Sequence, residues 1–346
     1  MFTSFDCWIW GCWPGLAELL QAKREFLQQN YSLDVRLVSV ASGRQGFVYH
    51  EDGLDIPTIV ELARKQEPFT GHPGVRHWHN ALEGLRATEA DVLVEATGTN
   101  LRDAEPGISH IRAALTQGMH VISANKGPIA LAARELFSLA RKHGVQLHEE
   151  ATVMAGTPVL STLQEGMAGA QVLEIRGILN GTTNYILSAM ATGREYADVL
   201  AEAQHRGYAE ADPTADVEGY DTLAKALILA ALAYNCRLTP DQVIRQGITT
   251  ITKAQVQQAL AEEKRIKLIA SLRHAAPGAK VPLDVRVEPV ALPLQDPLAQ
   301  VEGVMNAITF HTDTLSDVTI IGPGAGGLQT AQGLLADLIA VANTSR

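Results

Sequence analysis

Residues 91–125 read DVLVEATGTNLRDAEPGISHIRAALTQGMHVISAN, and this stretch decides the fold. Residues 91–100 begin with an apolar run typical of a buried strand and end in small polar residues. Residues 120–125 repeat that pattern, and residues 105–119 between them have the spacing of a helix. A strand, a helix and a second strand in this order predict two parallel strands of one sheet.

The same alternation continues on both sides of this unit and predicts an α/β fold, a Rossmann-type doubly wound parallel sheet. The further expected elements are helices at 16–29 and 133–144 and strands at 34–42 and 145–153. Ligands of such sheets bind beyond the carboxyl ends of the strands. Those ends are expected at residues 41–44, 96–100 and 123–126.

Beyond residue 151 the regular alternation of strand and helix patterns ends, and this change predicts a second domain of the α+β class. Its expected elements are a strand, turn and helix at 172–187, an apolar helix at 221–234, and strands at 280–292 and 305–322. We predict a dinucleotide-binding domain over residues 1–150, to which the Gly-rich segment 322–346 returns. Residues 151–321 are then expected to bind substrate, carry catalysis and form a homodimer or higher homo-oligomer.

Composition narrows the class of protein. A chain of 346 residues suits about two domains, and a net charge of −10 without basic runs argues against binding nucleic acid. No stretch approaches the roughly 20 apolar residues of a membrane span, and the N-terminus lacks a secretory pattern. The three Cys have neither disulfide-framework nor zinc-site spacing. These features predict a cytoplasmic enzyme acting on a small molecule.

The stretch WIWGCWPG, residues 8–15, stands where the phosphate loop of such a sheet belongs. That loop reads G-x-G-x-x-G, because glycines let the backbone approach a pyrophosphate at a helix N-terminus. Here Trp8, Trp10 and Trp13 have this spacing instead. Trp has the single codon TGG, and a one-base shift makes each TGG supply the first two bases of a glycine codon. We hypothesise that residues up to about Pro14 are a frameshifted reading of a normal strand and loop; the alternative is a genuine Trp-rich interface patch.

Two stretches of the second domain carry a more specific signal. They are GILNGTTNYIL at residues 177–187 and AQHRGYAEADPTADVEGYDTLAK at residues 203–225. With SANK, EATVMAGTP and GPGAGG elsewhere, the chain from about Gly15 onward resembles homoserine dehydrogenase, in the short form without an ACT-type regulatory domain. The signature positions that match are Ala203, Gly207, Asp212, Pro213, Asp216, Gly219, Asp221 and Lys225.

The resemblance implies reversible NAD(P)-dependent reduction of L-aspartate 4-semialdehyde to L-homoserine, on the route to threonine, methionine and isoleucine. Two alternatives stay open. One is a related dehydrogenase of another amino or hydroxy acid. The other is a non-catalytic copy of the enzyme, inactivated in its phosphate loop.

Lys225 and Asp221 are four residues apart on one face of an otherwise apolar helix. Spacing alone would favour a surface ion pair, but a lysine in such a helix is expected to point into a cleft. Desolvation lowers the pKa of a lysine and suits it to acid–base work. The resemblance assigns catalysis to Lys225. Lys126, after the strand at 120–125, is predicted as a second catalytic cation that also contacts cofactor; the alternative is an ordinary surface lysine.

Acidic and polar groups around these lysines suit an amino-acid substrate. Glu210, Asp216 and Asp221 form a predicted acidic cluster for its ammonium group, unless they are only a solvated loop. Asn180 and Thr182, in a glycine turn at a strand end, are predicted to hold its carboxylate or carbonyl. Turn chemistry alone would explain these last two residues equally well.

Two further sets of residues concern cofactors. No acidic residue follows the strand at 34–42, and Arg44 is close by, which favours NADP over NAD. The predicted cofactor-binding residues are Gly15, Arg44, Thr97, Ser123, Lys126 and Gly326. The resemblance also implies a monovalent cation such as sodium, bound mostly through backbone carbonyls, although a domain hinge is the alternative for this segment. Its implied ligands are Glu150, Val153, Ala155 and Thr157.

Overall fold

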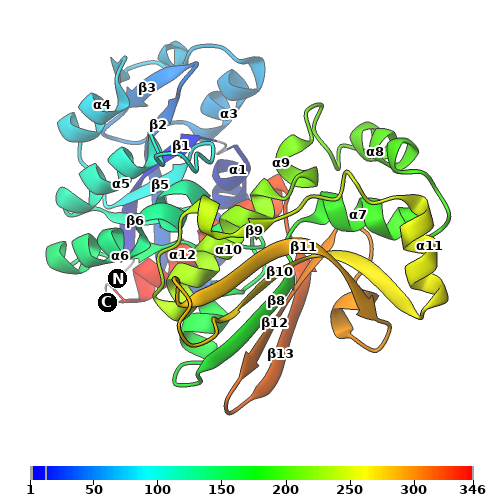
Figure 1. Ribbon diagram of the computed structural model, residues 1–346. Coiled ribbons are helices and arrows are strands. Elements are labelled where there is room, and N and C mark those ends of the chain that lie inside the picture. The colour runs from blue at the N-terminus through cyan, green and yellow to red at the C-terminus, as the bar shows by residue number, and fades with distance from the viewer. Residues whose placement is uncertain (1–2, 12–13, 345–346) are drawn as a thin grey trace. The chain divides into compact units, whose positions relative to one another are not determined.

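The computed structural model describes residues 3–11 and 14–344, and in the first strand it describes the side chain of Cys7 alone. Contacts divide the chain into two compact units (Figure 1). One contains the chain up to Gly156 together with the segment from Gly326 onward, and the other runs from Thr157 to Ala325. Among the described helices, none combines the length and the apolar character that crossing a membrane requires.

The described part of the first unit contains a seven-stranded sheet in the order β4-β3-β2-β1-β5-β6-β7. Its strands are β1 (Thr3–Gly11), β2 (Leu33–Ser42), β3 (Gly46–Tyr49), β4 (Arg76–Trp78), β5 (Val92–Ala96), β6 (His120–Ser123) and β7 (Leu147–His148). The run from β2 to β7 through β1 is parallel, which confirms the predicted doubly wound sheet. The antiparallel edge of β3 and β4 is not predicted from the sequence.

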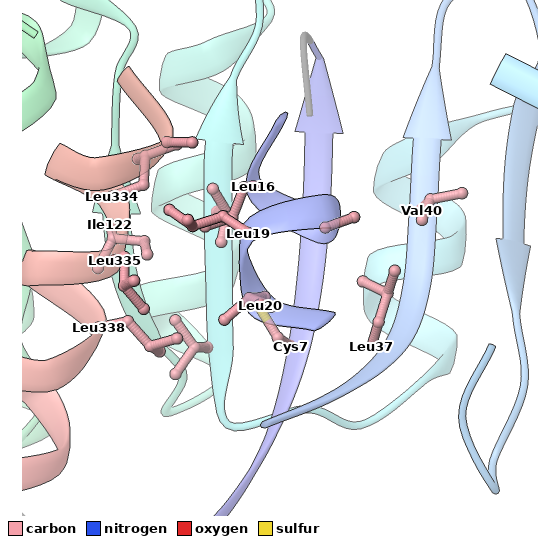
Figure 2. Packing of buried hydrophobic residues seen from close by; sticks show 14 of the residues in the cluster. Cys7, Leu16, Leu19, Leu20, Leu37, Val40, Ile122, Leu334, Leu335 and Leu338 are labelled. Atoms are coloured by element: carbon pink, nitrogen blue, oxygen red, sulfur yellow. The ribbon is translucent and has the colours of Figure 1, made fainter. Parts of the chain in front are cut away.

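The helices of this unit are α1 (Pro14–Ala22), α2 (Arg24–Tyr31), α3 (Ile56–Lys65), α4 (Ala81–Ala87), α5 (Gly107–Thr116), α6 (Lys126–His143) and α12 (Gly327–Thr344). The single helix predicted over 16–29 is wrong, because the chain breaks at Lys23, whose φ of −102° and ψ of 9° are not helical. Figure 2 shows Leu16 and Leu20 of α1 beside Leu335 and Leu338 of α12 in the core. The last helix of the chain therefore completes the hydrophobic core of the first unit.

The fourth predicted strand, over 145–153, is mostly wrong. Only β7 pairs with its neighbour β6, and the chain then forms a 3₁₀ turn over Glu150–Thr152. The N–H of Glu150 donates to the carboxylate of Asp337 in α12 at 3.0 Å. Because a side chain takes this N–H, it does not extend the sheet.

The described part of the second unit contains a six-stranded sheet in the order β13-β12-β8-β10-β11-β9. Its strands are β8 (Val172–Ile178), β9 (Ile244–Arg245), β10 (Lys264–His274), β11 (Leu283–Pro293), β12 (Met305–Thr312) and β13 (Ser316–Pro323), and its helices are α7 (Gly181–Met190), α8 (Tyr196–His205), α9 (Thr214–Val217), α10 (Tyr220–Tyr234) and α11 (Lys253–Ala261). The helices α7, α10 and α11 pack on β10 (Figure 1). The sheet places the turn between β8 and α7 next to α10.

Candidate active site

Lys225 lies on α10 with 4% of its surface exposed. Its Nζ donates to the carbonyl oxygen of Leu179 at 2.5 Å and to Oδ2 of Asp221 at 2.8 Å. A buried ammonium group is tolerated only when acceptors satisfy its N–H groups. The pair with Asp221 is therefore a largely buried ion pair rather than the surface pair that spacing alone favours.

Asn180 joins the start of α7 to two carboxylates. Its Oδ1 accepts from the N–H of Thr183 at 2.9 Å and so caps the helix. Its Nδ2 donates to Asp216 at 2.7 Å and to Asp221 at 3.0 Å. Thr182 Oγ1 lies 3.1 Å from the other oxygen of Asp216 and contacts the carbonyl of Tyr208. Asn180 thus has the turn role, because it caps α7, and it also orients two predicted site residues, a role that the sequence does not predict.

The predicted acidic cluster is only partly brought together. Burial raises the pKa of Asp216 above its ordinary value, the hydrogen bond from Asn180 opposes this, and the nearby charge of Asp221 raises it further. Glu210 is exposed on the loop between α8 and α9, and its backbone carbonyl accepts from Gln204 at 3.1 Å. The described contacts place two of the three carboxylates in one network with Lys225.

At the carboxyl end of β5, a second network surrounds the fully buried Glu95. One of its oxygens accepts the N–H of Thr97 at 2.9 Å and a contact from Thr97 Oγ1, and the other lies 2.8 Å from Nδ1 of His110. Asn125 Nδ2 donates to Thr97 Oγ1 at 2.9 Å. Neither Glu95 nor His110 is predicted from the sequence, although an acidic residue inside the apolar run VLVEA is a signal that could have found the first.

The end of β6 is ordered by the same group of side chains. Asn125 caps α6 by accepting from the N–H of Gly127 at 3.0 Å, so Lys126 is the first residue of that helix. Ser123 is fully buried, and its Oγ accepts from the N–H of Asn125 at 3.1 Å. Thr97, Ser123 and Lys126 therefore belong to neighbouring strand ends of the first unit.

The remaining predicted cofactor residues are in different settings. Arg44 is exposed in the turn after β2. A Cβ added at Gly15 would lie 3.1 Å from the carbonyl oxygen of Gly327, so this glycine lets α1 and α12 approach closely. Gly326 is exposed with φ of +127°, which side chains rarely adopt.

The segment implied for a cation is buried and conformationally unusual. Glu150, Val153 and Ala155 are at most 5% exposed, and Met154 and Ala155 have φ of 60° and 53°. Thr157 begins the second unit, and its Oγ1 donates to the Pro323 carbonyl at 2.9 Å. In the described residues, no group of three or more His, Cys, Asp or Glu side chains has metal-binding geometry.

Dinucleotides bind at the polar strand ends of doubly wound sheets. In the second unit of the same chain, a buried lysine belongs to a network of carboxylates. Together these two features are those expected of a nicotinamide-dependent dehydrogenase. The family model described as homoserine dehydrogenase matches residues 158–339, and that of the homoserine dehydrogenase NAD-binding domain matches residues 16–150. The chain belongs to the homoserine dehydrogenase family. It is an NAD(P)-dependent oxidoreductase of amino-acid biosynthesis that interconverts L-homoserine and L-aspartate 4-semialdehyde.

Individual relatives agree with this assignment over almost the whole chain. A homoserine dehydrogenase of Methanocaldococcus jannaschii is 36% identical over 96% of this chain and 96% of its own length. An NAD(+)-dependent homoserine dehydrogenase of Pseudomonas canavaninivorans is 37% identical over 94% of this chain and 91% of its own. A hyperthermophilic archaeal homoserine dehydrogenase solved with NADPH is 26% identical with a TM-score of 0.81, and the match covers 99% of this chain and 98% of that one.

Proposed function

We propose that Lys225 transfers the proton when the aldehyde is reduced and takes it back when homoserine is oxidised. The observation that carries this is its buried ammonium group, fixed by Asp221 and by the carbonyl of Leu179. The bound nicotinamide supplies or accepts the hydride. The oxygen of the aldehyde needs a proton as negative charge develops on it, and Lys225 donates that proton from Nζ. Asp221 holds the ammonium in place through the 2.8 Å contact.

For the substrate's ammonium group we propose Asp216 and Glu210, together with Asp221. Asn180 and Thr182 each donate to one oxygen of Asp216. A carboxylate has about four lone-pair sites, so these two bonds orient Asp216 and leave acceptor capacity for an ammonium group. Glu210, exposed on its loop, is available at lower desolvation cost.

For the cofactor we propose Gly15, Thr97, Ser123, Lys126 and Gly326 as binding residues and Arg44 as the residue that reads the 2′-phosphate of NADP. Polar groups at the ends of β5 and β6 fit a dinucleotide at this edge of the sheet. Arg44→Ala should weaken NADP(H) far more than NAD(H). An unchanged ratio of the two dissociation constants would assign that phosphate to another residue.

The frameshift hypothesis for residues up to about Pro14 remains our proposal for the phosphate loop. It is supported by the NAD-binding match, which begins at residue 16. It is also supported by the topology, because β1 lies between β2 and β5 and its carboxyl end includes Trp8 and Trp10. Trp13 lies outside the described residues. Genomic DNA that confirmed the written frame would refute the proposal.

We propose a monovalent cation such as sodium at the carbonyls of Glu150, Val153 and Ala155, with Thr157 as the fourth ligand. Left-handed φ angles at Met154 and Ala155 support this, since such strain persists only where surrounding structure requires it. Hard cations prefer oxygen ligands. Activity measured with sodium replaced by a large organic cation tests the site, and unchanged activity would refute it.

We also propose that the second unit forms a homodimer or higher homo-oligomer. Its edge strand β13 exposes 54% of Ile321. An edge strand with exposed apolar side chains is a template for association. Sedimentation of the wild type and of Ile321→Asp tests this, and a monomeric wild type would refute it.

The activity as a whole is tested in a coupled assay with NADPH. L-Aspartate 4-semialdehyde is compared with glutamate 5-semialdehyde, which has one more methylene between the amino-acid group and the aldehyde. We expect turnover with the first and little with the second, because Asp216 and Lys225 belong to one hydrogen-bonded network that fixes the span between them. Equal turnover of both would assign the site to another amino-acid dehydrogenase.

A further inference from the structure

A second buried lysine lies in the same unit as Lys225 and has no part in the proton transfer. Lys267, on β10, is 1% exposed. Its Nζ donates to Asn184 Oδ1 at 2.9 Å, to Ser188 Oγ at 3.2 Å and to the carbonyl of Val301 at 2.5 Å. Three donors meet three acceptors, so the ammonium form is fully satisfied where it is buried.

These acceptors belong to α7 and to the segment that follows the 3₁₀ turn over Pro297–Gln300. Asn184 Nδ2 donates to the carbonyls of Val301 and Met305, at 3.2 and 3.0 Å. A Cβ at Gly181 would lie 2.6 Å from the carbonyl of Val304, so the segment 301–305 contacts the first residue of α7 directly. We call this segment the seat of α7.

We propose that Lys267 is a positioning residue for homoserine turnover, because its ammonium group fixes α7 on its seat and thereby places the Asn180 cap that orients Asp216 and Asp221. The proposal rests on the proposed function of those two carboxylates. Lys267 acts one helical turn beyond the cap, and it contacts neither of them in the described structure.

The contact of Lys267 with α7 and its seat depends on whether the lysine is charged. Burial and, to a smaller extent, the positive charge of Arg265 lower the pKa of Lys267 to about 8, and the negative charge of Glu302 opposes this shift. Arg265 and Glu302 pair with each other, and the groups that α7 presents, Asn184 and Ser188, are uncharged. The neutral amine has one N–H fewer, so the contact is complete below about pH 8 and weakens as the pH rises through that value.

Two substitutions at Ser188 test the proposal without touching the substrate network. Ser188→Asp places a carboxylate beside Nζ, raises the pKa of Lys267, and should move the alkaline fall of kcat/KM for homoserine up by about one pH unit. Ser188→Ala removes an acceptor of the ammonium group and should move the fall down. Ser188 lies roughly 10 Å along α7 from Gly181, so the hydrogen bonds of Lys225 should stay in place. Identical alkaline limbs in the wild type and both variants would overturn the proposal.

Lys267→Met provides the second measurement. We expect about a tenfold lower kcat/KM for homoserine with an unchanged NADPH dissociation constant by fluorescence, since α7 and its seat lie outside the NAD-binding match. Lys253→Met on α11, whose lysine is 41% exposed, is the matched control. A lower melting temperature with homoserine constants within about twofold of wild type would mean a purely structural lysine. If Lys267→Met does not fold, the alkaline limbs of Ser188→Asp and Ser188→Ala alone test the proposal. An inactive Lys225→Met bears on the proton-transfer proposal only.

Discussion

The two units bury charges of opposite sign. In the first unit the buried acidic side chains are Glu95, which is surrounded by donors and by His110, and also Glu149, Glu150 and Asp337. In the second the buried charges are the ammonium groups of Lys225 and Lys267, surrounded by carbonyl, amide and carboxylate oxygens. Each buried charge requires several partners, and those partners come from segments that end at the proposed ligand sites. Burial of a charge therefore fixes the loops around it.

The two arrangements differ in how far the charge lies from its ligand. Glu95 is fully buried and contacts Thr97 and Asn125, so we expect it to act on the proposed cofactor through these two residues. Lys225 belongs to a network that includes the part-exposed Asp216. Substitutions in the first unit should then affect the cofactor alone, and those in the second should affect homoserine alone.

The largest expected effect is that of Lys225→Met. Loss of a general acid typically costs about 10²–10⁴-fold in turnover, while NADPH affinity should stay at the wild-type value. Steady-state kinetics and fluorescence titration measure the two quantities, with the exposed Lys280→Met as control. Turnover within about threefold of wild type would remove Lys225 from the mechanism.

The second effect concerns the first unit. Replacing residues up to Pro14 by the one-base-shifted reading, which restores a G-x-G-x-x-G loop, should improve NADPH affinity by about 100-fold or more. Several charge-assisted hydrogen bonds of about 1.5–3 kcal/mol each become available, whereas Pro14 has no N–H to offer. The two proteins are expressed side by side and titrated with NADPH. Equal affinity would show that WIWGCWPG is not a damaged phosphate loop.

Glu95→Gln should weaken NADPH by about tenfold, the cost of roughly one charge-assisted hydrogen bond. The amide oxygen can still accept from Thr97, but the NH2 group that then faces His110 cannot accept a hydrogen bond. The homoserine KM at saturating NADPH should not change. A change in the homoserine KM equal to that in NADPH affinity would break the distinction between the units.

The smallest expected effect is that of Asp216→Asn, a rise of a few fold in the homoserine KM. Asp216 must be ionised to bind an ammonium group, and its pKa is raised. Homoserine should therefore bind at full strength above that raised pKa, and its KM should rise by the same few fold as the pH falls through it. This acid limb should be absent in Asp216→Asn and kept in the exposed control Asp198→Asn. An acid limb that persists in Asp216→Asn would assign it to another group.

Whether an interaction can be predicted from the sequence depends on how far apart in the chain its residues are. Asp221 and Lys225 are four residues apart on one helix, so their contact is readable from spacing. Glu95 and His110 belong to a strand and a helix, and the sequence has no periodicity that pairs them. The contacts of Lys267 are not predictable either, because its acceptors Asn184 and Val301 are distant from it in the chain.

The strands likewise include some that the sequence predicts and some that it does not. The strands β2, β5 and β6 are predicted because continuous apolar runs mark them. The strand β10 is not predicted, since charged residues interrupt its run KRIKLIASLRH. Its place between β8 and β11 is set by tertiary pairing, not by local pattern.

The packing of α12 has a consequence for biosynthesis. Its leucines, among them Leu334 and Leu338, fill the core beneath α1, yet all of residues 157–325 are made before them. Domains generally fold as units during synthesis, beginning from the N-terminus. Here the unit that starts first is completed only after residues 157–325 have been made, so on the ribosome its apolar face should stay open until α12 has been synthesised.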